Sequence, residues 1–451
     1  MWLLITLISY VEVKMIGKAI RFIQNPRPYF QVIWYRWWIQ PIVWPIQVLV
    51  YRYVILSKLV KRCKKKKQLT VLFLAMSVSY WKYDTVYRRM LQDPYFNPII
   101  MPALRTNQSV EEQLRDHDEL MCEFKKRGYN IVSGYDKNAK KFVDARSLNP
   151  DIVFYTHPYS GPGRLRRQYD FWAMRNSLIC YAPYYFPNEL DSFFFNHPIQ
   201  NAAWQLYYAY DQILMVAKRF MDNKAVNVKI AGYALEEEIA EISVNDGNLA
   251  WNNDISGRLR VIWAPHHSIA ETDTVARTST FLTYCEDMKK IAVKYKKKLL
   301  IAFKPHPVLY SRLLAIWGKK RVDEYYDFWM RQENTLLQTG EYLSLFKGSD
   351  AMIHDCGSFK CEYLCLNKPC MFLYRKDFLK DVNEVGRSAL LAHYEGHSLL
   401  DVISFIENVV IANNDTKVQE RLHFRETYFK SPNGRMFSEN VLSAIMSEIS
   451  S

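Results

Sequence analysis

Two short motifs place side chains with acid–base and phosphate-binding chemistry directly after apolar runs. The first is Lys304-Pro305-His306-Pro307, which follows the run 299–303. Its ammonium and imidazole groups could bind phosphate oxygens, and a histidine can also transfer a proton because its pKa lies near neutrality. Two prolines restrict the backbone around His306, so we expect a fixed imidazole. The motif is a candidate catalytic site, with a structural turn as the alternative.

The second motif is the turn Asp355-Cys356-Gly357-Ser358, between the apolar run 351–354 and a predicted helix over 358–366. Backbone N–H groups at a helix N-terminus next to glycine can bind a diphosphate. Ser358 could cap the helix or donate its hydroxyl to a phosphate. The turn therefore predicts a diphosphate site, with an ordinary helix cap as the alternative.

Further histidines also follow apolar runs. His157 lies in Tyr155-Thr156-His157-Pro158-Tyr159, and the pair His266-His267 follows Trp263-Ala264-Pro265. Adjacent histidines can indicate a metal, but sequence neighbours rarely bind one ion together, and no carboxylate motif completes a site. We therefore predict no metal site at these histidines.

Strands and helices must alternate to position these motifs. In the first half, apolar runs predict strands at 71–78, 152–155, 178–181 and 226–230, and amphipathic patterns predict helices at 107–126 and 198–221. In the second half, strands at 261–264, 299–303, 351–354 and 370–374 alternate with helices at 280–295, 308–330 and 358–366. This order predicts an α/β protein with two Rossmann-like sheets. Ligands of such sheets bind at the carboxyl ends of the strands, where the motifs lie.

Charge and composition divide the chain. Its 451 residues carry a net charge of +14, and residues 1–67 hold thirteen Lys or Arg against one acid, Glu12. A basic head on a nearly neutral body indicates an anionic membrane surface and argues against a nucleic-acid partner. We predict a basic aromatic membrane-associating segment over 1–67, an acceptor domain over 68–242, and a nucleotide-donor domain with a closing helix over 243–451. The loop-like stretch 243–257 joins the last two.

The apolar run within the basic head is too short to span a bilayer. Residues 29–60 are rich in Trp, Tyr and Ile, but two arginines and two prolines interrupt them, and the uncharged run 37–51 falls short of the roughly 20 residues required. We predict burial in the membrane interface, with the basic run 61–67 on an anionic leaflet. A re-entrant or spanning segment and packing against protein are the alternatives.

Cysteine usage indicates a reducing compartment. Eight cysteines in this length do not form a disulfide framework, and no signal peptide with a cleavage site opens the chain. Four of them lack the paired spacing of zinc sites and are interpreted as buried thiols: Cys356, Cys361, Cys365 and Cys370. The predicted location is the cytoplasmic face of the bacterial cell membrane, as a peripheral protein.

Taken in order, the motifs resemble the CDP-glycerol glycerophosphotransferase family, which includes the teichoic acid primases and polymerases. That family shows Ala-Pro after a strand, Lys-Pro-His-Pro, an Asp-Tyr-Ser-Ser-type turn, a carboxylate-Tyr-Leu element, and Lys-Pro before a strand. The resemblance covers roughly residues 70–446 and is most specific over 258–375. The matching residues are Trp263-Ala264-Pro265, Lys304-Pro305-His306-Pro307, Asp355-Cys356-Gly357-Ser358, Glu362-Tyr363-Leu364 and Lys368-Pro369.

The resemblance implies two Rossmann-like domains in a glycosyltransferase-B arrangement. It further implies transfer of glycerol phosphate, or a related polyol phosphate, from a CDP-linked donor to a hydroxyl of a lipid-linked surface-polymer acceptor, with release of CMP. His306 and Ser358 would contact the donor diphosphate, and Glu362 a donor hydroxyl or the ribose. No cofactor is implied with certainty, and a divalent cation beside the diphosphate stays open. The donor-binding residues so implied are Lys304, Asp355, Gly357, Ser358 and Glu362.

The sequence departs from the family in two places. In the Asp-Tyr-Ser-Ser-type turn, Cys356-Gly357 replaces Tyr-Ser, and one hydroxyl is lost. Polymerases of the family have a His-Gly motif that is proposed as the base, whereas the corresponding block 181–186 contains no histidine. His157 is our first candidate for that role and His266 the second. The alternative functions are a nucleotide-sugar glycosyltransferase of the same architecture, in surface polysaccharide synthesis, and a non-enzymatic membrane scaffold. Release of CMP, as opposed to a nucleoside diphosphate, separates the two enzymes.

Overall fold

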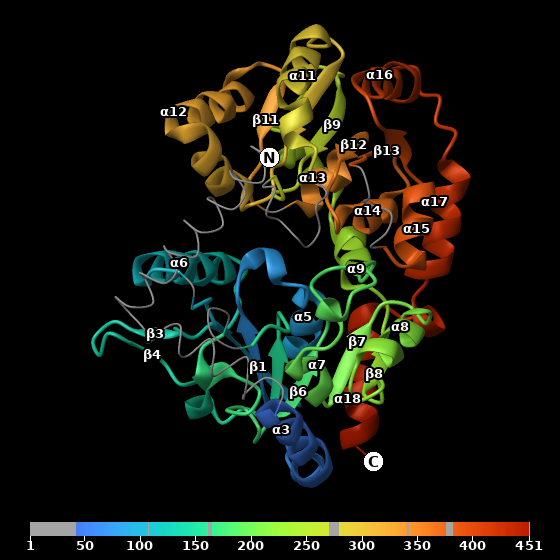
Figure 1. Cartoon of the computed structure of the whole chain (residues 1–451). Coiled ribbons are helices and arrows are strands. Elements are labelled where there is room, and N and C mark those ends of the chain that lie inside the picture. Colours follow the sequence, from blue (N-terminus) through green and yellow to red (C-terminus); the bar gives the residue numbers. More distant parts are fainter. Residues whose placement is uncertain are drawn as a thin grey trace, which may run out of the picture. The chain divides into compact units, whose positions relative to one another are not determined.

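The chain forms two compact units, and each is described by itself (Figure 1). The computed structural model describes residues 42–106, 108–160, 165–269, 279–340, 342–375 and 382–450. The first unit comprises the residues up to Ser77 with Pro98–Cys180 and His197–Trp204. The second comprises Val78–Asn97, Tyr181–Asn196 and Gln205–Ser451. Because the units interleave along the chain, the boundaries at 67 and 242 stay predictions.

The first unit contains a sheet whose strands lie in the order β2-β1-β5-β6. β1 and β5 pair in parallel, with Val71 opposite Ile152. Every residue of β5 and β6 is buried, so these strands are apolar throughout and do not alternate. The strands are β1 Leu69–Ala75, β2 Phe96–Pro102, β5 Ile152–Tyr155 and β6 Leu178–Tyr181, with the hairpin β3 Tyr135–Asp136 and β4 Lys141–Phe142; the helices include α6 Val110–Lys126 and α7 Pro198–Ala202.

One long helical segment packs against the first unit. It runs through α3 Trp44–Val50, a π-helical stretch Tyr51–Ile55 and α4 Leu56–Cys63. The buried Tyr51 hydroxyl donates to the carbonyl of Ser177 at 2.7 Å and accepts the N–H of Ile179 at 3.2 Å. Packing against protein therefore accounts for one face of this part of the predicted membrane segment. Residues 1–41 lie outside the described part. Among the described helices, none has the length and apolar character to cross a bilayer.

The second unit contains a sheet of six parallel strands in the order β11-β10-β9-β12-β13-β14. Along the chain, β9 is followed by β10 and β11 on one side of it, and then by β12, β13 and β14 on its other side. The strand order thus reverses between β9 and β12, where ligands of such sheets bind. These sheets confirm the predicted α/β class. The strands are β9 Leu259–Ala264, β10 Leu299–Phe303, β11 Thr335–Leu337, β12 Ala351–His354, β13 Cys370–Leu373 and β14 Tyr394–Gly396, and this unit also holds the parallel pair β7 Gln205–Tyr208 and β8 Val228–Ile230.

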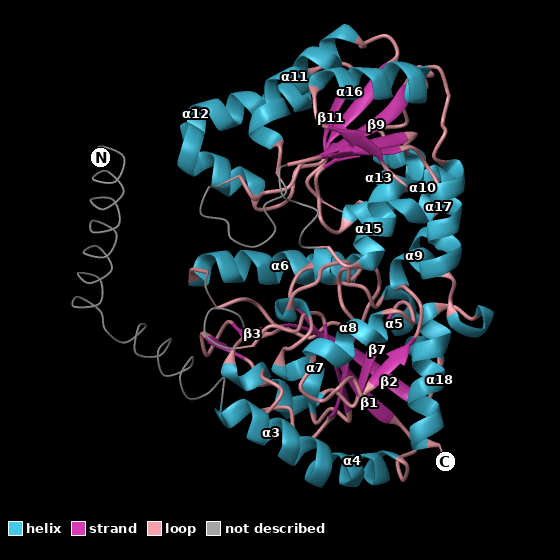
Figure 2. Cartoon of the chain, turned by 45° about the vertical axis from the view of Figure 1, so that its right-hand side comes forward, coloured by secondary structure: helices cyan, strands magenta, loops and turns pink. Residues whose placement is uncertain are grey.

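Helices cover both faces of this second sheet (Figure 2). Trp263 lies on one face within a buried aromatic cluster, where its ring centroid is 5.0 Å from that of Phe303 and 5.4 Å from that of Trp329. The opposite face packs Phe372 against Leu390. The helices of the unit are α5 Asp84–Gln92, α8 Ile213–Phe220, α9 Ala234–Glu241, α10 Val244–Ala250, α11 Phe281–Lys294, α12 Leu309–Arg331, α13 Leu343–Gly348, α14 Phe359–Glu362, α15 Glu384–Leu391, α16 Leu399–Ser404, α17 Val418–Phe424 and α18 Phe437–Ile449.

Two element predictions were wrong. The predicted helix 198–221 is instead α7, strand β7 and α8, because Gln205–Tyr208 is fully buried as a strand. The predicted loop 243–257 contains α10, which begins with a capping box between Ser243 and Asp246. Strands 152–155, 178–181, 299–303 and 351–354 have the predicted bounds.

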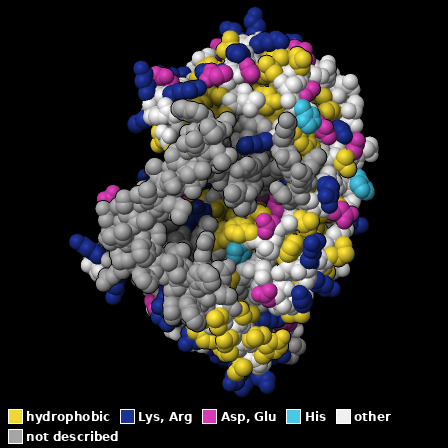
Figure 3. Space-filling view, viewed as in Figure 1, with side chains coloured by type: hydrophobic (Ala, Val, Ile, Leu, Met, Phe, Trp, Pro, Cys, Tyr) yellow, Lys and Arg dark blue, Asp and Glu magenta, His cyan; other side chains and the backbone are white. Residues whose placement is uncertain are grey.

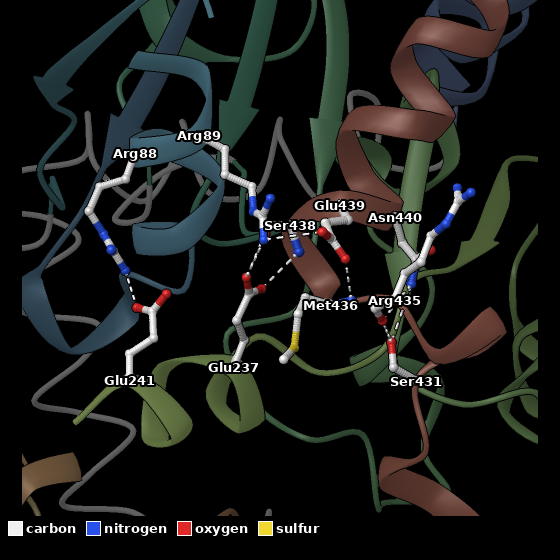
Figure 4. A network of polar contacts seen from close by, with 10 residues as sticks. All are labelled: Arg88, Arg89, Glu237, Glu241, Ser431, Arg435, Met436, Ser438, Glu439 and Asn440. Atoms are coloured by element: carbon white, nitrogen blue, oxygen red, sulfur yellow. Dashed lines mark hydrogen bonds and ion pairs between the residues drawn. The ribbon is translucent and has the colours of Figure 1, made fainter. Parts of the chain in front are cut away.

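The closing helix α18 is fixed to α9 and α5 by a polar network (Figure 4). The Ser438 hydroxyl and backbone N–H donate to the Glu237 carboxylate at 2.6 and 2.9 Å. Arg89 of α5 lies 3.7 Å from Glu237 and 3.4 Å from Glu439. The C-terminal helix is thus part of the second unit, although it follows the last strand by some forty residues.

Candidate functional site

Three loops of the second unit meet because the strands that precede them are neighbours. β10, β9 and β12 are adjacent in the sheet, so their carboxyl ends lie side by side. The backbone N–H of Lys304 donates to the Trp263 carbonyl at 2.8 Å, and that of His306 donates to the Pro265 carbonyl at 3.1 Å. The motif after β10 is therefore held against the motif after β9.

His266, His267 and His306 gather at this edge. The ring centroids of His267 lie 4.2 Å from those of both His266 and His306, and His266 and His306 are 5.1 Å apart. The structure thus brings His306 and His266, two predicted catalytic residues, into one cluster. It adds His267, whose ring stands beside that of its sequence neighbour.

Local hydrogen bonds fix the tautomers of two of these histidines. Nδ1 of His306 accepts the backbone N–H of Val308 at 3.2 Å, and Nδ1 of His266 accepts that of Ser268 at 3.3 Å. A neutral imidazole that accepts at Nδ1 carries its proton on Nε2. Burial and the neighbouring His267 and Arg312 lower the pKa of His266 to about 3, so its ring is neutral near pH 7. Both rings present Nε2–H as a hydrogen-bond donor.

The Nε2–H tautomer of His266 and His306 affects whether the three histidines can bind a metal ion. One ring nitrogen from each of His266, His267 and His306 lies within 4.8 Å of the others, a spacing that could hold a metal ion. A metal would need a lone pair, however, and in His266 and His306 the Nδ1 lone pair already accepts a backbone N–H. The cluster therefore suits an anion that accepts hydrogen bonds better than a cation.

Asp355 joins the β12 end to two neighbouring segments. Its carboxylate accepts the backbone N–H of His266 and both the N–H and the hydroxyl of Thr280, the latter at 2.9 Å. The side chain is buried, and burial raises its pKa to about 6 despite these hydrogen bonds. Asp355 thus fixes the loop that carries His266, and its predicted contact with a donor stays a prediction.

The turn after β12 is partly exposed, and a hydrogen bond from a distant segment holds it in place. The Asn188 amide donates to the Gly357 carbonyl at 3.2 Å. Ser358 precedes the short helix α14, and its hydroxyl caps no backbone N–H of that helix. The predicted helix 358–366 is one α-helical turn followed by a 3₁₀ turn, Tyr363–Leu366.

Glu362 is buried at the end of the short helix α14 that follows this turn. The Glu362 carboxylate, which is buried, accepts hydrogen bonds from the hydroxyls of Tyr233 and Tyr342, each at 2.8 Å. The buried Lys82 ammonium donates to the Tyr342 hydroxyl at 2.7 Å. Burial raises the pKa of Tyr233 well above its usual value, and the charge of Glu362 acts in the same direction. Two tyrosine hydroxyls therefore hold the Glu362 carboxylate in the protein interior.

Lys304 is also largely buried. Its positive charge acts on the thiol of Cys356, whose pKa burial raises well above its usual value while Lys304 opposes the rise. Lys304 follows β10, which is separated by one strand, β9, from the β12 end that carries the turn. All four cysteines of the predicted group are buried, as expected: Cys356, Cys361, Cys365 and Cys370.

His157 belongs to the first unit and is described with it. It is buried, its Nδ1 accepts the backbone N–H of Tyr159 at 3.2 Å, and the Tyr159 ring lies 5.1 Å from that of His197. His157 therefore shows the same tautomer as His306 and His266. This arrangement makes it a hydrogen-bond donor through Nε2.

Several residues around the turn could not be selected from the sequence. Asn188 and Glu189 follow the apolar strand β6 by a few residues, and this strand-end position was the one available signal. Glu189 forms an ion pair with the fully buried Lys360 at 3.1 Å. Lys82 and Tyr342 carry no motif, and their role depends on contacts between distant segments.

Comparison with known proteins shows which protein family the second half of the chain resembles. Residues 253–447 match the family model described as CDP-Glycerol:Poly(glycerophosphate) glycerophosphotransferase, and this range contains every site residue named above from the three loops. This match supports a protein of the CDP-glycerol glycerophosphotransferase family. It is a transferase of that type. No curated protein sequence matches the chain.

Solved structures of similar fold support the same architecture. A histidine-to-asparagine variant of the wall teichoic acid polymerase TagF soaked with CDPG is 13% identical with a TM-score of 0.54, over 91% of this chain and 98% of that one. The same variant without the soak is 12% identical with a TM-score of 0.54, over 96% and 98%. The MnaA–UDP co-structure from S. aureus is 11% identical with a TM-score of 0.52, over 84% and 96%. At these identities the likeness concerns the fold, which is glycosyltransferase-B-like.

Proposed function

We propose that the protein transfers glycerol phosphate, or a related polyol phosphate, from a CDP-linked donor to a hydroxyl of a membrane-linked surface-polymer acceptor, and releases CMP. The observation that carries the proposal is the family match over 253–447, a range in which Lys304 and His306 follow β10 and Ser358 follows β12, the two strands that flank β9. The TagF structure soaked with CDPG supports the choice of donor.

The site has the groups that such a transfer requires. Phosphoryl transfer depends mainly on positioning and on stabilising the charge of the phosphoryl oxygens. The Lys304 ammonium and the Nε2–H groups of His306 and His266 supply positive charge and donors. Their positions are set by backbone hydrogen bonds at the ends of β9 and β10, so little reorganisation is needed when a diphosphate binds.

A donor screen tests this function. Full-length protein in mild detergent is titrated calorimetrically with CDP-glycerol, CDP-ribitol and UDP-, GDP- and CMP-linked sugars, with H306A as the site control. We expect a CDP-polyol to bind selectively and H306A to weaken it by about 10- to 100-fold, the loss of a hydrogen bond to a charged group. Selective binding of a nucleotide sugar would favour the glycosyltransferase alternative instead.

We also propose that the protein acts at an anionic membrane surface through the free face of its N-terminal helical segment. Ile46, Leu49 and Tyr53 are 55%, 55% and 77% exposed and recur at helical spacing, opposite the buried Tyr51. Figure 3 shows hydrophobic side chains gathered over α3, with Lys and Arg beside them. The run 61–67 adds basic side chains at the end of α4. Apolar side chains bordered by basic ones are typical of interfacial helices.

Vesicle binding tests the membrane proposal. The double variant I46E/L49E should sediment with vesicles containing anionic lipid at least 10-fold less than wild type, because two apolar side chains no longer enter the interface. The control L400E changes another strongly exposed leucine, 76% accessible on α16, and should leave sedimentation unchanged. Equal sedimentation of I46E/L49E and wild type would contradict the proposal.

A further inference from the structure

Glu189 lies beside the turn that follows β12. Its carboxylate Oε1 is 3.7 Å from the position that a Cβ atom would take on Gly357. Its neighbour Asn188 donates to the Gly357 carbonyl at 3.2 Å. The Glu189 side chain is 18% exposed, so it is partly accessible beside the turn that carries Ser358.

The position of Glu189 is fixed on two sides. The backbone N–H of Asn383 donates to the Asn188 carbonyl at 3.1 Å, and an isolated antiparallel bridge joins Glu189 to Val382. The Lys360 ammonium, whose side chain is fully buried, donates to Glu189 Oε1 at 3.1 Å. This ion pair orients the carboxylate beside the turn.

Four other candidates for proton transfer in this unit already accept hydrogen bonds. His306 and His266 accept backbone N–H groups at Nδ1 and so present a proton, and not a lone pair, at Nε2. Asp355 and Glu362 are buried, and both oxygens of each carboxylate accept hydrogen bonds. Glu189 combines a carboxylate, partial exposure and contact with the turn.

We propose that Glu189 is the general base that accepts the proton of the acceptor hydroxyl; this inference rests on the proposed function. The acceptor oxygen forms a bond to the phosphorus that carries glycerol. The bond from that phosphorus to the oxygen bridging the diphosphate breaks, and its electron pair leaves with CMP. The hydroxyl proton passes to the Glu189 carboxylate and then to solvent. A carboxylate performs the same task for the substrate hydroxyl in protein kinases.

A paired experiment separates this role from a purely structural one. E189Q alone would remove the carboxylate that pairs with the buried Lys360, which destabilises the fold. The comparison is therefore between K360M and E189Q/K360M, in which no buried charge is left unpaired. E286Q removes an exposed carboxylate that pairs with Lys289 at 3.0 Å and serves as the control expected to match wild type. The probes are CDP-glycerol and a detergent-dispersed lipid that ends in a glycerol phosphate hydroxyl.

We expect E189Q/K360M to unfold at the same temperature as K360M and to bind CDP-glycerol with the same Kd. Its kcat for CMP release should be about 100- to 10,000-fold lower, the usual contribution of a general base. The acid limb of the pH–rate profile seen with K360M should disappear. Equal kcat in the two variants, or a loss confined to donor binding, would overturn the role of Glu189. Wild-type protein that releases no CMP would instead overturn the proposed function and this inference with it.

Discussion

The buried Asp355 should make the folded protein less stable as pH rises from about 4 to about 6. Burial raises its pKa from an ordinary 3.8 to about 6, so the folded state holds this proton more tightly than the unfolded chain does. The stabilisation is fully present below the unfolded pKa and is lost as pH rises through the folded pKa. A difference of about 2 pKa units corresponds to about 3 kcal/mol of unfolding free energy.

The variant D355N isolates this effect because it removes the titration and keeps the side-chain size. Urea unfolding gives the free-energy gap between wild type and D355N at several pH values. We expect the gap in favour of wild type to be about 2 kcal/mol larger near pH 4 than near pH 7, because the unfolded carboxyl is already partly ionised at pH 4. D350N is the matched control, since Asp350 accepts the backbone N–H of Arg260 at 2.7 Å between the amino ends of the same strands, β12 and β9. A D355N gap that stays constant with pH would refute the reasoning.

Three further predictions concern packing and donors. Tyr233→Phe removes a hydrogen bond to the buried Glu362 carboxylate and should lower the unfolding free energy by about 1–3 kcal/mol in urea titrations, and no change would show that the tyrosine is dispensable. Gly348→Ala places a Cβ atom against the Gly247 carbonyl and should cost about 1–3 kcal/mol, whereas G340A, at an open position, should cost less than about 1 kcal/mol. His306→Gln should bind CDP-glycerol more tightly than H306A, because its amide can replace the Nε2–H donor; equal Kd values would argue against a donor role.

Much of the second unit could be predicted from the sequence. The runs 299–303 and 351–354 are apolar throughout because both faces of a parallel sheet are covered, and this pattern fixes the strand bounds. The motifs at Lys304–Pro307 and Asp355–Ser358 were assigned to the carboxyl ends of those strands for the same reason. Prediction failed where local pattern and tertiary packing disagree, as at Gln205–Tyr208, where a strand is buried inside a predicted helix.

Which side chains come together depends on the order of the strands in the sheet and on the packing of the loops. The sequence does not state that β10, β9 and β12 are neighbours, and this order is what brings His306 to His266. The tautomers depend on hydrogen-bond geometry within loops, and the pairing of Glu189 with Lys360 joins residues 171 positions apart. Hydrophobic periodicity encodes which residues are buried, but the pairing of distant polar groups depends on chain packing, which no local pattern specifies.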